Sequence, residues 1–135
     1  MNFATPGDLS FLFHFLDQEH FPFLSVFGGP RGDFYLRFWW DREDGLDQWL
    51  LVESSKEIIH QLGRFEIGMQ SAALAGQRAW LLSSPEEIYG EVAEDLSQCK
   101  THTYTENLPS WKGYLPEDRP LHEEDIGDYL SWLNK

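Results

Sequence analysis

The chain has 135 residues, with 23 acidic and 10 basic side chains and a formal net charge of −13. This charge excludes the ordinary kind of nucleic-acid binder, because phosphate binding is driven by Lys and Arg. The length suits one domain, and the aromatic fraction of 16% argues against disorder, since acidic disordered chains are poor in aromatic residues.

The first half of the chain has the pattern of a β-meander. Aromatic and aliphatic runs predict three strands, which are residues 24–27, 34–40 and 49–52. Turn formers separate the first two strands, and a charged loop over residues 41–47 is expected before the third. Consecutive strands with short connections favour antiparallel pairing.

The first 22 residues allow two interpretations. Alternating Phe residues favour a strand near residues 10–15, whereas Thr5 as a cap and Pro6 at the first helical position could begin a helix. We prefer the strand.

Helix signals follow the third strand. Ser54 and Glu57 have the spacing of a capping box, which predicts a helix over residues 55–62. Gly63 is expected in the left-handed conformation that ends many helices. Residues further on could form a helical turn that begins near Met69 and ends at Gly76.

The second half begins with one more strand and one more helix signal. Residues 79–82 predict a fourth strand, and Ser84 with Pro85 predicts a helix that runs to about residue 95. Residues 97–122 are expected to be an irregular connection, because proline and glycine residues interrupt any long regular element.

A C-terminal helix is expected over residues 123–133. Its apolar positions fall on one helical face, and they are Ile126, Tyr129, Leu130 and Leu133. The predicted fold is therefore one α+β domain over residues 1–135. We expect residues 1–96 to form an antiparallel meander of four or five strands together with helices. In the whole chain, two to four helices are expected.

Compartment signals are few. Cys99 is the only cysteine, so no intrachain disulfide is expected. We find neither the pattern of a signal peptide nor an apolar run long enough to span a membrane. The sequence predicts a reduced cytoplasmic protein that is not in a membrane.

The order of motifs resembles a family of small uncharacterised bacterial proteins. The segments that carry the resemblance are Phe-Pro-Phe-Leu at 21–24, Phe-Tyr-Leu-Arg-Phe-Trp-Trp-Asp at 34–41, Asp-Gln-Trp-Leu-Leu-Val at 47–52 and Leu-Pro-Glu-Asp at 115–118. The resemblance covers about the first 60 residues well and the rest loosely. It implies a compact α+β domain in bacteria, and no catalytic residues come with it.

Two acidic clusters invite a metal interpretation. His14, Asp17, Glu19 and His20 supply carboxylates and imidazoles, but at no established zinc-ligand spacing. The acids of residues 41–47 do not fit an EF-hand, because Gly45 would fall at position 5 and Val52 at position 12. We expect polar turns at both places, with no cofactor, no metal and no catalytic residue.

A partner surface is the sharper hypothesis. Trp39 and Trp40 must face opposite sides of a sheet, so one needs a cover, either the C-terminal half of the chain or a partner. Acidic residues also outnumber basic ones more strongly in residues 83–135 than before them. The predicted partner-binding residues are Trp39, Trp40, Asp41, Glu43, Asp44, Asp47, Glu123, Glu124 and Asp125.

These features predict a non-enzymatic domain that docks a basic protein partner, as an immunity protein, antitoxin or defence-system accessory protein would. One alternative is a DNA-mimic inhibitor of a nucleic-acid enzyme, with carboxylates spaced like phosphates along one face. A second alternative is a small metal-dependent enzyme that uses the region from His14 to His20. Direct nucleic-acid binding is not expected.

Overall fold

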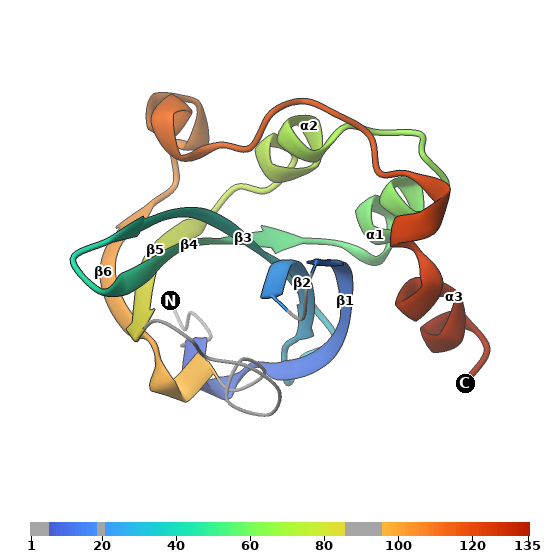
Figure 1. Ribbon diagram of the computed structural model, residues 1–135, viewed down its shortest axis with the longest axis horizontal. Coiled ribbons are helices and arrows are strands. Elements are labelled where there is room, and N and C mark those ends of the chain that lie inside the picture. The colour runs from blue at the N-terminus through green and yellow to red at the C-terminus, as the bar shows by residue number, and fades with distance from the viewer. Residues whose placement is uncertain (1–5, 19–20, 86–95) are drawn as a thin grey trace.

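A computed structural model describes residues 6–18, 21–85 and 96–135 (Figure 1). Six strands form one antiparallel sheet in the order β1-β2-β3-β4-β5-β6. Their bounds are β1 Ser10–Gln18, β2 Phe21–Gly28, β3 Phe34–Glu43, β4 Leu46–Ser54, β5 Ala79–Pro85 and β6 Lys100–Thr105. Each strand pairs with the next one along the chain, which confirms the predicted α+β fold with an antiparallel meander. The sheet has more strands than the four or five expected.

In the described part of the chain, three α-helices accompany the sheet, and they are α1 Lys56–Gly63, α2 Met69–Leu74 and α3 Gly127–Leu133. Short 3-10 turns are η1 Pro6–Asp8, η3 Leu96–Gln98, η4 Leu108–Tyr114 and η5 Glu123–Asp125. The helix predicted up to residue 95 lies outside the described residues, except that Pro85 is the last residue of β5. None of the described helices is long and apolar enough to cross a membrane.

The sheet is curled, and its two faces carry separate apolar clusters (Figure 1). On the outer face, side chains such as Leu36 and Leu50 pack with Ile59 and Leu62 of α1. The inner face holds a second cluster that includes Phe27 and Trp49. Because both faces of the sheet are covered, the strand sequences are nearly continuous apolar runs and do not alternate between apolar and polar residues.

The prediction of a charged loop over residues 41–47 is wrong. β3 continues to Glu43 and β4 begins at Leu46, so Asp44 and Gly45 alone make the turn. Both residues have positive φ, 53° and 76°, as a tight two-residue hairpin turn requires. The Asp-Gly pair was the local signal for this hairpin.

Two details predicted for α1 are also wrong. The capping residue is Ser55 rather than Ser54, since the Ser55 hydroxyl accepts the amide of Ile58 at 3.3 Å. Gly63 does not adopt the left-handed conformation and is instead the last, buried residue of α1. A Cβ at this position would overlap the ring of Tyr129, so close approach explains the glycine.

The connection over residues 97–122 is more ordered than predicted. It contains β6, which the sequence hides because Lys100–Thr105 is polar and almost wholly exposed. Asp118 further along accepts the backbone amide of Ser71 at 3.0 Å and caps the first turn of α2, the helical turn that was predicted.

The C-terminal helix is interrupted at its start. η5 ends at Asp125, Ile126 leaves helical geometry, and α3 begins at Gly127. Ile126 and Tyr129 are buried as predicted, but Leu130 and Leu133 are 46% and 43% exposed. Trp132 packs on the body in their place, with its ring centroid 5.0 Å from that of Phe13.

Candidate partner-binding site

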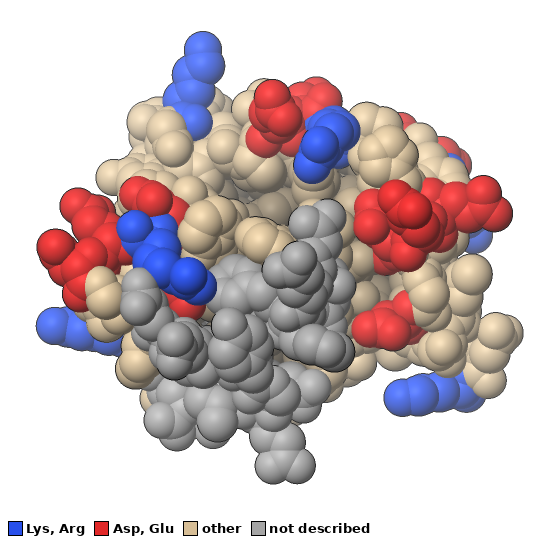
Figure 2. Space-filling view, in the orientation of Figure 1, with Lys and Arg blue, Asp and Glu red and all other residues tan. Residues whose placement is uncertain are grey.

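The predicted partner-binding residues fall into two separate regions. Those from 39 to 47 lie towards the tip of the β3–β4 hairpin, and those from 123 to 125 form η5 near α3, at the other side of the molecule (Figure 1). Figure 2 shows separate groups of acidic side chains at the left, at the top and at the right of this face, with basic side chains among them. The structure therefore does not bring these residues together as one site.

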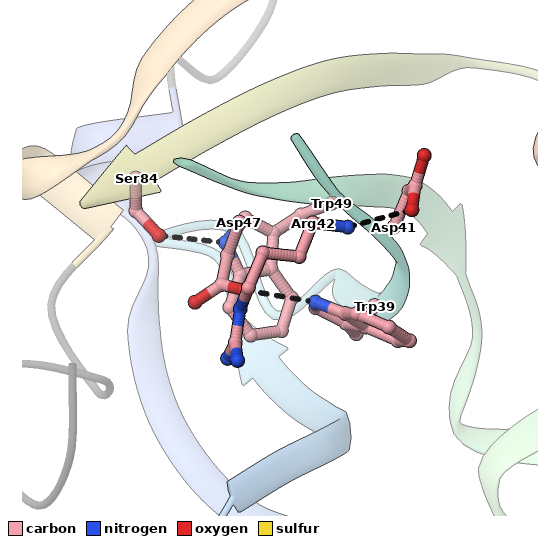
Figure 3. A network of polar contacts seen from close by, with 6 residues as sticks. All are labelled: Trp39, Asp41, Arg42, Asp47, Trp49 and Ser84. Carbon is pink, nitrogen blue, oxygen red and sulfur yellow. Dashed lines mark hydrogen bonds and ion pairs between the residues drawn. The ribbon is translucent and has the colours of Figure 1, made fainter. Parts of the chain in front are cut away.

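The hairpin region is organised by a buried carboxylate (Figure 3). Asp47 is fully buried, and its Oδ1 accepts hydrogen bonds from Trp39 Nε1 at 3.1 Å and Arg42 Nε at 2.8 Å. Beside it, Trp49 Nε1 donates to Ser84 Oγ at 2.8 Å. Asp47 thus stabilises the hairpin internally and is not available to a partner.

The remaining acids of the hairpin are partly offset by Arg42. This side chain pairs with Asp47, and its backbone amide donates to Asp41 Oδ1 at 2.8 Å. Glu43 and Asp44 are exposed at the turn. Neither of the two cavities described below is lined by these carboxylates.

Trp39 and Trp40 pack in the clusters on opposite faces of the sheet, and the register shift between Trp39 and Asp41 places Trp40 in a β-bulge. The Trp39 ring makes an edge contact with Phe23, at a centroid distance of 5.6 Å. The Trp40 ring lies 4.8 Å from that of Tyr114, in the C-terminal part of the chain. Each ring is therefore partly covered by the chain itself.

The η5 region has a different geometry, because its carboxylates border cavities. A cavity of about 220 Å³ is lined by His14, Phe15, Glu124, Asp125, Gly127 and Asp128. An open depression of about 570 Å³ is lined by His122, Glu123 and Glu124. Glu124 borders both, and no Lys or Arg appears among the described residues that line either one.

The η5 turn fixes the direction of its acids. The amide of His122 donates to Asp125 Oδ2 at 3.1 Å, and the amide of Asp125 donates to the carbonyl of His122 at 2.9 Å. This reciprocal pair holds Asp125 against the start of the turn, and Glu123 and Glu124 are exposed beside it.

The opposite wall of the cavity comes from β1. His14 Nδ1 lies 2.7 Å from Ser25 Oγ, and Arg37 Nη2 donates to the same hydroxyl at 3.2 Å. Arg37 is itself buried, with its guanidinium 4.3 Å from the Trp49 ring centroid. These contacts, and the Phe11 ring at 4.6 Å between centroids, turn the His14 ring towards the inner face of the sheet. Position 14 therefore borders the cavity, while the Phe15 ring packs on the α3 side against Tyr129.

The metal hypothesis for the region from His14 to His20 is not addressed by these contacts. The side chains of Asp17, Glu19 and His20 lie outside what the structure describes. Within the described residues, no group of three or more His, Cys, Asp or Glu side chains is placed to hold a metal ion.

Sequence reasoning identified the η5 acids but missed Asp128 and Phe15 as parts of the same cavity, and it assigned His14 to a different hypothesis. No local pattern could have joined them, since β1 and α3 meet only in the folded chain. No family model, curated protein or solved structure matches this chain. The resemblance to a bacterial family therefore stays a prediction.

Proposed function

We propose that this chain is a non-enzymatic binding domain that docks a basic segment of a partner protein at the acidic cavity between β1 and α3. The observation that carries the proposal is the lining of the smaller cavity, where Glu124, Asp125 and Asp128 face a wall formed by His14 and Phe15. Its volume of about 220 Å³ suits the head of one Arg or Lys side chain.

Electrostatics favour a cationic group at this place. One exposed ion pair contributes only about 0–1 kcal/mol. Several carboxylates around one cavity add such terms, and a guanidinium can hydrogen-bond two of them at once. The net charge of −13 also accelerates encounter with a basic partner at low ionic strength.

The hairpin acids are the weaker half of the predicted surface. The buried Asp47 carboxylate is already bonded to side chains of the hairpin, and Arg42 places a positive charge among the remaining acidic residues. Asp44 and Glu43 nevertheless are exposed carboxylates like those of η5, so they provide a control with the same change in charge.

An immunity, antitoxin or defence-accessory role would use a site of this kind, because such proteins block a basic active face. The DNA-mimic alternative calls for a row of carboxylates along one face. The separate acidic groups in Figure 2, with basic side chains beside them, give that alternative less support than a local basic docking site.

The test measures binding of a short blocked peptide with one central arginine by isothermal titration calorimetry. The double variant Glu124→Gln/Asp128→Asn should raise the Kd about tenfold, which corresponds to about 1.4 kcal/mol. The control Glu43→Gln/Asp44→Asn removes the same charge elsewhere and should change the Kd less than about twofold.

Equal losses in the two double variants would contradict the site, because they would show that only the overall charge attracts the peptide. Binding that does not weaken with added salt would also contradict it, since exposed charge pairs are screened by salt. Displacement of DNA from a nucleic-acid enzyme by the unmodified chain would support the DNA-mimic alternative instead.

A further inference from the structure

The walls of the 220 Å³ cavity come from segments far apart in the sequence. His14 and Phe15 belong to β1, whereas Glu124, Asp125 and Asp128 belong to η5 and the start of α3. α3 packs directly beside β1 (Figure 1). The cavity therefore exists only while α3 is docked on the sheet.

One side chain joins the two walls. Tyr129 follows Asp128 in the sequence, is buried, and stacks on Phe15 with a centroid distance of 5.5 Å and an interplanar angle of 27°. Its hydroxyl lies 2.9 Å from His60 Nδ1 of α1, and its ring occupies the space beside Gly63. Tyr129 thus fixes α3 to β1 and α1 at once.

The rest of α3 adds limited support to this docking. Ile126 is buried and Trp132 packs on Phe13, but Leu130 and Leu133 point away from the body. A helix of seven residues is not stable in water without tertiary contacts. Formation of α3 and its docking are therefore expected to occur together.

We infer that binding of the basic segment and docking of α3 are coupled, with Tyr129 as the positioning residue. This inference rests on the proposed function. A ligand that bridges both walls binds only the docked state, so it shifts the docking equilibrium towards that state. By linkage, a change that undocks α3 weakens the apparent affinity in proportion to the docked fraction.

The test combines amide hydrogen exchange of residues 127–133 with titration of the same arginine peptide. In Tyr129→Ala we expect faster exchange in α3, a Kd raised about tenfold or more, and exchange slowed again at saturating peptide. Leu133→Ala is the matched control on the same helix, and its exposed side chain predicts unchanged exchange and affinity. Tyr129→Phe keeps the buried ring, so it serves if the alanine variant does not fold, and it should show the same changes to a smaller degree.

The outcomes separate the two proposals. If the unmodified chain does not bind the peptide, both fail. If it binds and Tyr129→Ala exposes α3 to exchange without a change in Kd, the coupling fails while the binding site stands. Exchange in α3 that stays as slow in Tyr129→Ala as in the unmodified chain would overturn Tyr129 as the positioning residue.

Discussion

The ring of Tyr129 lies directly against the backbone of Gly63, in space that any larger residue at position 63 would need. This contact joins the end of α1 to α3, two helices that are far apart in the sequence. It is reinforced by the hydrogen bond between the Tyr129 hydroxyl and His60, one turn earlier in α1. Gly63, which the sequence predicted to end α1 in the left-handed conformation, is instead the residue that lets Tyr129 pack closely against α1.

Gly63→Ala should destabilise the protein. The added methyl group must displace the Tyr129 ring, and overpacking of this kind costs about 1–3 kcal/mol. The free energy of unfolding from urea titration measures the loss. Gly113→Ala is the control, because a Cβ there meets no atom within 4 Å. An unchanged midpoint for Gly63→Ala would show that α3 does not pack on α1 as described.

The hydrogen bonds of Asp47 predict a second effect on stability. Asp47→Ala should lower the free energy of unfolding by about 1–3 kcal/mol, because it removes the fully buried carboxylate that accepts from the partly buried indole N–H of Trp39. Arg42 is 43% exposed, so water can solvate its charge and limit the loss. Glu43→Ala, at the exposed last residue of β3, should change stability by less than about 0.5 kcal/mol. Equal urea midpoints for the two variants would contradict the internal role of Asp47.

The start of α1 offers a test between adjacent serines. Ser55→Ala should cost about 1 kcal/mol, since the hydroxyl accepts the amide of Ile58 at 3.3 Å. Ser54→Ala should be neutral or slightly stabilising, because the Ser54 hydroxyl is buried and has no hydrogen-bond partner among the described residues. Urea titration of both variants decides the point, and a larger loss for Ser54→Ala would restore the capping position read from the sequence.

Much of the fold was predictable because its signals are local. The segments that form β2, β3 and β4 are dense in aromatic and aliphatic residues. A capping serine predicted the helix after β4, although the predicted position of the cap was wrong by one residue. β6 was not predictable in this way. Its Lys100–Thr105 segment is exposed and polar, and it is a strand only because β5 offers it backbone hydrogen bonds.

The site was predictable only in part for the same reason. Glu123 to Asp125 stand out as an acidic run, but their relation to His14 and Phe15 depends on where α3 docks. Helical periodicity assigned Leu130 and Leu133 to the buried face, whereas the short helix turns Trp132 inward. Which flank of a terminal helix is buried is decided by tertiary packing, and periodicity alone does not contain that information.

Tyr35 predicts how stability depends on alkaline pH. Burial raises the pKa of the Tyr35 phenol well above its ordinary value of 10.0, and the hydrogen bond to Asp33 raises the pKa further. The unfolded chain ionises this phenol first, at the ordinary value. The contribution of Tyr35 is therefore complete below pH 10.0 and is lost as pH rises from there through the higher pKa of the folded state.

Urea titrations on both sides of pH 10.0 should show a loss of unfolding free energy that is smaller in Tyr35→Phe, because phenylalanine has no proton to release. Tyr114→Phe removes a hydroxyl from a ring that is only partly buried, and it controls for the change in residue type. Lysine and arginine titrate in the same range, so the difference between the variants, rather than the absolute slope, isolates Tyr35. Parallel pH profiles for the unmodified chain and Tyr35→Phe would show that the phenol ionises equally easily in the folded and unfolded states.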